Sequence, residues 1–175
     1  VPFRVKLHTP ATPIVRGGSL SLKVEVIRDA NFTKDVVVKI LTKPPGIGAS
    51  SNIKITSKNS VGYYPLTANS GTPIGEWEIG VQGEVAASGG GNMLAASEFV
   101  KLKIEEPYLS MKINMAAIER GQSGEMVCDL DINRPFEGFA KAELKGLPPF
   151  SVTEQVEFDS NTSQIRFALY TEEKA

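Results

Sequence analysis

The sequence contains few of the residues on which most enzymes depend. Its 175 residues include one histidine, His8, and one cysteine, Cys128. Catalytic sites of the Ser-His-Asp or Cys-His type need an imidazole held beside the nucleophile. His8 stands at the end of a predicted edge strand, before Thr9 and Pro10, where a surface or capping role suits it better. We therefore expect a protein that is not an enzyme.

Ligands for metals are scarce as well. One histidine and one cysteine cannot form a zinc centre, and no acidic loop has the spacing of a calcium site. Asp159 with Asn161, and Asp29 with Asn31, offer at most a weak ion site, and the same residue types are common in ordinary turns. We expect neither a metal nor a cofactor.

An excess of charge of one sign is also absent. The chain has 19 Lys and Arg against 20 Asp and Glu, and the basic residues are dispersed, so no nucleic-acid partner is expected. Apolar runs are short and interrupted by charges, which argues against membrane insertion. The opening "VPFRVKLH" lacks the charged start and apolar stretch of a signal peptide, which is either absent or removed before this numbering begins.

The sequence does contain an internal repeat. "IVRGGS" at 14–19 returns as "IERGQS" at 118–123, a shift of 104 residues. Seven identities over 32 positions share this shift: Ile14 with Ile118, Arg16 with Arg120, Gly17 with Gly121, Ser19 with Ser123, Phe32 with Phe136, Pro44 with Pro148 and Pro45 with Pro149. Apolar positions between them also agree. The pattern predicts a tandem repeat of one domain.

Within each copy the hydrophobic period is two. "SLSLKVEVI" at 19–27 alternates apolar and polar residues, as a strand with one buried face does, and no window predicts a long amphipathic helix. The strands predicted in the first copy are 3–8, 19–27, 36–41, 52–56, 62–67, 75–83 and 97–104. About seven short strands in roughly 105 residues are typical of an immunoglobulin-like sandwich.

The predicted fold is therefore all-β, with two tandem immunoglobulin-like β-sandwich domains at 1–105 and 106–175. The connector "EEP" at 105–107 is short and contains no Gly or Ser, so we expect a restricted hinge. At a shift of about 103, "RFALYTEEKA" matches "YYPLTANSGT", which leaves the second domain without its last strands. The sequence thus predicts a second domain incomplete at its C-terminus, in a fragment of a longer protein.

Three segments resemble bacterial immunoglobulin-like repeats of large exported multidomain proteins, of planctomycete type and also appended to secreted peptidases. They are "RDANFTKDVVVKI", "KPPGIGASSNIKIT" and "PLTANSGTPIGEWEIGV". The motif positions are Phe32, Pro44, Pro45, Gly46, Ile47, Pro73, Gly75 and Trp77 in copy one, and Phe136, Gly138, Leu147, Pro148 and Pro149 in copy two. Lys34, Lys43 and Phe150 depart from the pattern. The resemblance implies a fold and an exported setting (periplasmic, cell-surface or secreted).

Candidate site residues are few. Cys128 occupies the inward position that matches Val24, either as a small buried residue or as the partner of a disulfide with a missing strand. A possible contact loop comprises Ser88, Gly89, Gly90, Gly91 and Asn92, and a strand follows it where a phosphate-binding loop needs a helix. Arg16, Gly17, Arg120 and Gly121 are interpreted as structural turns, with ligand binding by both copies as the alternative.

These observations predict a non-catalytic module that serves as a spacer, a stabilising appendage or a protein interaction domain. Its partners would be other domains of the parent chain or another protein. The alternative is a carbohydrate-binding accessory module of a secreted hydrolase or peptidase, which needs exposed coplanar aromatic side chains. Trp77 alternates with Ile79 and Val81, which favours core packing over carbohydrate binding. Tyr63, Tyr64, Tyr108 and Tyr170 form no evident row.

Overall fold

The computed structural model describes residues 1–173, in which every regular element is a β-strand. No helix in this part of the chain is long and apolar enough to cross a membrane. The chain divides into two compact units, Val1–Glu106 (unit 1) and Pro107–Ala175 (unit 2). Each unit is described by itself.

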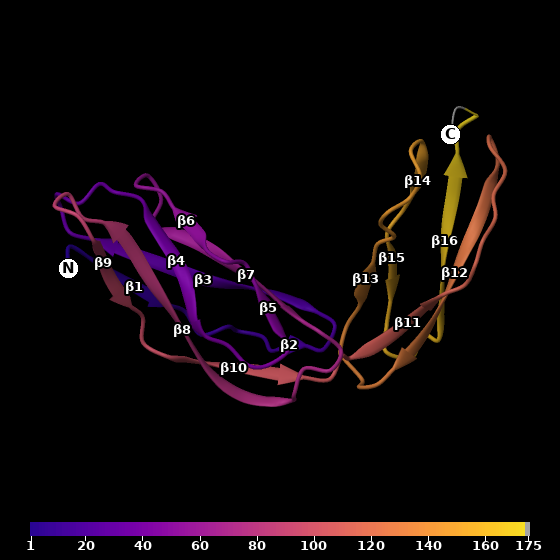
Figure 1. Ribbon diagram of the computed structural model, residues 1–175. Coiled ribbons are helices and arrows are strands. Elements are labelled where there is room, and N and C mark those ends of the chain that lie inside the picture. Colours follow the sequence, from indigo (N-terminus) through magenta and orange to yellow (C-terminus); the bar gives the residue numbers. More distant parts are fainter. Residues whose placement is uncertain (174–175) are drawn as a thin grey trace. The chain divides into compact units, whose positions relative to one another are not determined.

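Unit 1 contains two sheets (Figure 1). The first has the order β1-β3-β7-β5 and comprises β1 (Phe3–Leu7), β3 (Ser19–Arg28), β7 (Val61–Ala68) and β5 (Ile47–Ala49). The second has the order β2-β10-β8-β4-β6 and comprises β2 (Ile14–Val15), β10 (Val100–Glu105), β8 (Gly75–Ala86), β4 (Val36–Thr42) and β6 (Ile53–Ile55). β9 (Asn92–Ala96) also pairs with β8.

One apolar core lies between the two sheets of unit 1. The alternation of β3 sends Leu22, Val24 and Val26 inward, where they are 1%, 0% and 2% exposed. Residues of β4, β8 and β10 close the other side of the same core. Each sheet therefore buries one face and leaves the other to solvent.

The strand predicted at 97–104 begins only at Val100 in the structure. β9 and β10 both run antiparallel to β8 but are separated by residues 97–99. The N–H of Ser97 donates to the carbonyl of Val81 (2.8 Å), whereas the N–H of Val81 donates to the Ser97 hydroxyl (3.1 Å). Because a side chain replaces the backbone acceptor there, the ladder is broken at Ser97, and the predicted start of the strand was three residues too early.

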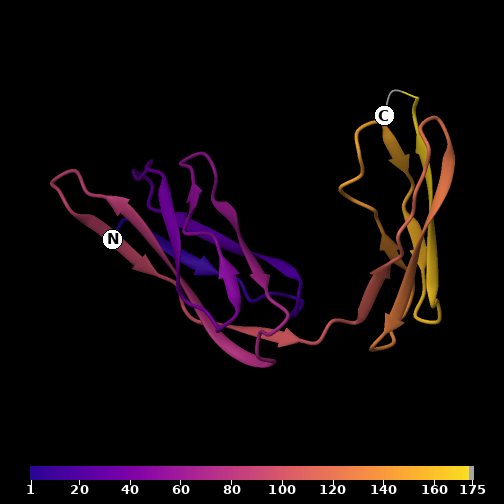
Figure 2. The ribbon, with the colours of Figure 1, turned by 45° about the vertical axis from the view of Figure 1, so that its right-hand side comes forward.

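Unit 2 contains a four-stranded sheet and a two-stranded ribbon (Figure 2). The sheet has the order β11-β12-β16-β14 and comprises β11 (Leu109–Ile113), β12 (Ser123–Ile132), β16 (Gln164–Thr171) and β14 (Ser151–Thr153). The ribbon pairs β13 (Ala140–Ala142) with β15 (Val156–Phe158). A small core joins the two, formed by Cys128, Leu130, Ala142, Phe158, Ile165 and Phe167.

Strand pairing in unit 2 follows that of unit 1 position by position. β12 starts and ends 104 residues after β3. Ser19 pairs with Thr67 in unit 1, and Ser123 pairs with Tyr170 in unit 2. Tyr170 stands 103 residues after Thr67, the shift that aligns this last segment in the sequence, so the register is kept. Corresponding strands also stand in the same order in the two four-stranded sheets, β1-β3-β7-β5 and β11-β12-β16-β14.

A turn after the Pro-Pro pair has the same backbone in both units although the residues differ. Gly46 in unit 1 has a φ of 78°, and Phe150 at the corresponding place has a φ of 62°. The turn closes in each case with a 3.3 Å hydrogen bond to the carbonyl of Pro44 or Pro148. Phe150 is the one non-glycine residue with positive φ in the described part of the chain, and this conformation is unfavourable for a side chain with a Cβ.

Candidate functional site

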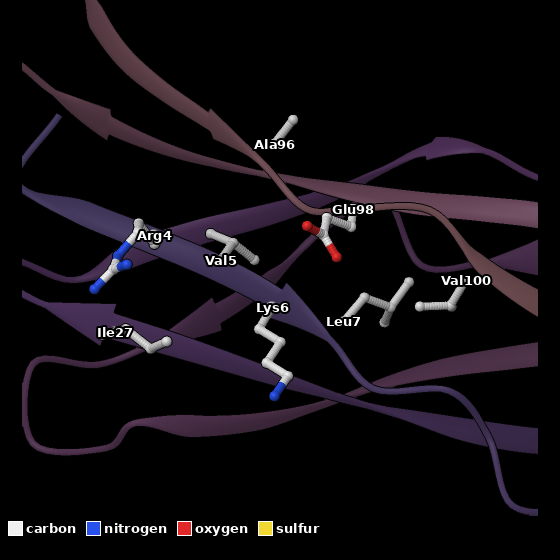
Figure 3. A pocket seen from close by; sticks show the side chains of 8 residues that line it. All are labelled: Arg4, Val5, Lys6, Leu7, Ile27, Ala96, Glu98 and Val100. Carbon is white, nitrogen blue, oxygen red and sulfur yellow. The ribbon is translucent and has the colours of Figure 1, made fainter.

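A slot on unit 1 opens between the edges of its two sheets (Figure 3). It has a volume of about 360 Å³. Its lining consists of Arg4, Val5, Lys6 and Leu7 from β1, Ile27 from β3, and Ala96, Glu98 and Val100 from the β9–β10 segment. β1 is an end strand of its sheet, and β9 pairs with β8 alone, so the slot lies where neither sheet continues.

The slot combines an apolar floor with a charged rim. Val5 and Leu7 form the floor and are 6% and 4% exposed. Arg4, Lys6 and Glu98 stand at the rim and are exposed. None of these three side chains has an ion pair or hydrogen bond with another residue of 1–173. The eight lining residues include no hydroxyl, thiol or imidazole, so the groups present can bind a partner by apolar contact and charge.

The predicted contact loop forms the turn between β8 and β9. The N–H of Ala87 donates to the carbonyl of Gly91 (3.0 Å), and the ammonium group of Lys34 donates to the carbonyl of Ala86 (2.9 Å). None of Ser88, Gly89, Gly90, Gly91 and Asn92 lines the slot. Asn92 is the first residue of β9, so including it in the loop was wrong.

The repeated turn before β3 and β12 has one geometry in both units. Gly17 has a φ of 72° and Gly121 a φ of 71°, at the third position of a four-residue turn. The turn closes with the N–H of Gly18 on the carbonyl of Val15 (2.9 Å) in unit 1. In unit 2 the N–H of Gln122 donates to the carbonyl of Glu119 (3.1 Å). Glycine takes this positive φ without steric cost.

The two arginines of these turns make different contacts. Arg16 donates through Nε to the carbonyl of Thr72 (2.7 Å) and through Nη1 to Glu106 (2.5 Å). Arg120 is exposed and has no side-chain partner among residues 1–173. The residue in register with Thr72 is Ala175, which lies outside the described residues. Arg16 thus ties its turn to the loop before β8 and to the end of unit 1.

We expect Arg16→Ala to lower the free energy of unfolding of unit 1 by about 1 to 2 kcal/mol, because a charged donor to a partly buried carbonyl is lost. Urea unfolding followed by the fluorescence of Trp77, the one tryptophan of the chain, measures this change. Arg120→Ala is the matched control, and circular dichroism should show a change below about 0.5 kcal/mol. Equal losses in the two variants would contradict the difference in contacts.

Cys128 lies in the core of unit 2 and is 1% exposed. Its thiol is free, and burial raises its pKa, assisted by the charge of Asp129. The sequence has no second cysteine, so the disulfide with a further strand stays a prediction.

The other candidates from the sequence have local partners. His8 Nε2 lies 2.9 Å from a carboxylate oxygen of Glu25. The carboxylate of Asp159 accepts hydrogen bonds from the N–H of Asn161 (3.0 Å) and from the hydroxyl of Thr162 (2.9 Å), as in an ordinary turn. Within residues 1–173, no three His, Cys, Asp or Glu residues lie close enough together to hold a metal ion.

The aromatic residues occupy separate environments. Trp77 packs against the core of unit 1. Tyr64 is fully buried there and donates its hydroxyl to the carbonyl of Ser50 (2.6 Å), and burial raises its pKa. Tyr63 is 64% exposed on β7, whereas Tyr108 and Tyr170 belong to unit 2.

Comparison with known proteins leaves the function open. No protein-family model matches the chain, and no curated protein matches it. Among solved structures, a protein of unknown function from Porphyromonas gingivalis W83 is similar over 97% of this chain and 84% of its own. The identity is 12% and the TM-score 0.40. A likeness at this level assigns neither a family nor an activity.

Proposed function

We propose that the chain is a non-catalytic, immunoglobulin-like module of an exported bacterial protein and acts as a protein interaction domain. The slot of unit 1 carries this proposal, since its unpaired rim charges are binding groups that the fold itself does not use, and they stand beside apolar residues at the edge of the core. The exported setting rests on the sequence resemblance.

The strand arrangement supports the immunoglobulin-like assignment. β1, β3 and β7 occupy the places of strands A, B and E, whereas β4, β8 and β10 occupy those of C, F and G. The conserved register between β3–β7 and β12–β16 supports a tandem repeat, because chance similarity of two strand-rich segments would not keep the pairing partners.

The slot suits an extended acidic peptide with apolar residues at alternate positions. Side chains of such a peptide point alternately to the two sides. One side would contact Val5 and Leu7, and the other would bring carboxylates beside Arg4 and Lys6. Glu98 faces the slot from the β9–β10 side, so it would disfavour acidic residues there and fix the orientation of the peptide.

Fluorescence anisotropy with labelled ten-residue peptides tests this proposal. The peptides alternate valine with glutamate, lysine or glutamine. We expect the glutamate peptide to bind most tightly and Lys6→Glu to weaken it about five-fold, since an exposed ion pair contributes up to about 1 kcal/mol. Lys58→Glu is the control, an equal charge reversal at an exposed residue that does not line the slot.

Two results would refute the slot as the binding site. One is equal affinity for the three peptides, which would mean that charge plays no part in recognition. The other is equal weakening by Lys6→Glu and Lys58→Glu, which would indicate general attraction to the protein without a defined site.

A further inference from the structure

Unit 2 exposes an apolar strand face whose counterpart in unit 1 is covered. The register identifies the counterparts, because Val5 pairs with Val26 and Met111 pairs with Leu130, 104 residues later. Val5 and Leu7 are 6% and 4% exposed, whereas Met111 and Ile113 are 48% and 55% exposed. β8 covers this face in unit 1, where a Cβ added to Gly83 would stand 2.6 Å from the side chain of Val5.

The ribbon of unit 2 is also shorter than its counterpart. β4 extends from Val36 to Thr42, and its first three residues pair with β6. The remainder of β4 pairs only with β8. β13 consists of just the three residues that pair with β15. Strand structure thus ends at the point where a neighbour of the β8 type would have to continue it.

Unit 2 contains a cavity of about 400 Å³ at a place that side chains fill in unit 1. Its lining includes Ile118, Met126 and Leu169. The corresponding residues of unit 1, Ile14, Leu22 and Leu66, are each 1% exposed. Ile14 lies in register beside Ile104 of β10, so a side chain of β10 closes this region in unit 1.

We propose that unit 2 binds a two-stranded antiparallel β-hairpin of a partner protein, with the apolar alternation of β8–β10. One strand of the hairpin pairs with β13, whose strand structure then extends beyond Ala142. The other lies along residues 116–119 and places an apolar side chain in the cavity. This proposal rests on the comparison of the two units and is independent of the slot on unit 1.

Charge specifies the hairpin further. In unit 1, Lys39 of β4 forms a 2.5 Å ion pair with Glu84 of β8. The residue in register with Lys39 is Glu143, which is 54% exposed at its side chain and lies 3.5 Å from Lys145. The charge is therefore reversed at this place, and the hairpin should carry Lys or Arg where β8 has Glu84.

A labelled synthetic peptide of residues 75–105 with Glu84→Lys tests the proposal on the full 175-residue chain. We expect saturable binding in fluorescence anisotropy, about five-fold tighter than binding of the peptide that keeps Glu84. A peptide of the same composition with scrambled order is the control. Hydrogen exchange should show new protection at 140–145 and at 111–113, and alkylation of Cys128 should slow.

Two variants of the chain test whether the peptide binds at unit 2. Met111→Glu with Ile113→Glu should abolish binding, and because these side chains are half exposed, circular dichroism should show unit 2 still folded. Leu41→Glu with Leu94→Glu, at exposed apolar positions of unit 1 that do not line the slot (43% and 47%), should bind as the unmodified chain does. The proposal is overturned by absence of binding, by new protection confined to unit 1, or by sedimentation showing that a second copy already covers the face.

Discussion

Tyr64→Ala should lower the free energy of unfolding of unit 1 by about 3 to 5 kcal/mol, the range found when large buried aromatic side chains are truncated. The side chain of Tyr64 is the largest among those that are fully buried. Its removal leaves a cavity in the core and also removes the hydroxyl that donates to the carbonyl of Ser50. Urea unfolding followed by Trp77 fluorescence measures the loss within unit 1.

Tyr63→Ala is the matched control, one residue earlier on the same strand. Tyr63 is 64% exposed, so we expect a change below about 0.5 kcal/mol. Comparable losses from the two substitutions would mean that β7 presents its faces differently from the structure, with the register to β3 shifted by one residue.

Gly83→Val should destabilise unit 1 by about 3 kcal/mol, at the upper end of the range for overpacked cores. An added Cβ would stand 2.6 Å from Val5, 2.9 Å from Phe3 and 3.0 Å from Val36. All three neighbours are core side chains with exposed fractions of 6% or less, so none can move aside into solvent. Thermal unfolding by circular dichroism, together with urea unfolding, measures the effect.

Gly89→Val provides the comparison for this substitution. No atom lies within 4 Å of a Cβ at Gly89, so the same added side chain should change stability little. A tolerated Gly83→Val would show that β8 does not lie against β1 and would also weaken the proposal for unit 2, which takes that packing as its template.

Strand periodicity predicted the long strands because their alternation is local. β3 and β7 have ten and eight residues, so each contains enough repeats of the apolar–polar alternation to be recognised. β2 and β5 have only two and three residues and exist because of partners far away in the chain. No local pattern contains that information, and the sequence analysis accordingly missed both.

The slot could not be found in the sequence for a related reason. Arg4 and Arg28 look alike there, since each is a basic residue in a strand of alternating character. Arg28 donates to four backbone carbonyls, those of Lys34, Ile55, Thr56 and Asn59. Arg4 has no such partner in the described chain. Whether a charge is already satisfied depends on tertiary neighbours, and only the structure distinguishes the two.

The backbone of Phe150 has a consequence for the folded population of unit 2. A left-handed conformation at a residue with a Cβ costs roughly 1 to 2 kcal/mol, and this cost falls on the unit with the smaller core. The closer the free energy of unfolding is to zero, the more a bound partner changes the fraction of molecules that are folded. Phe150 thus lowers the stability of unit 2, so a bound partner would raise the folded fraction of unit 2 more than that of a more stable unit.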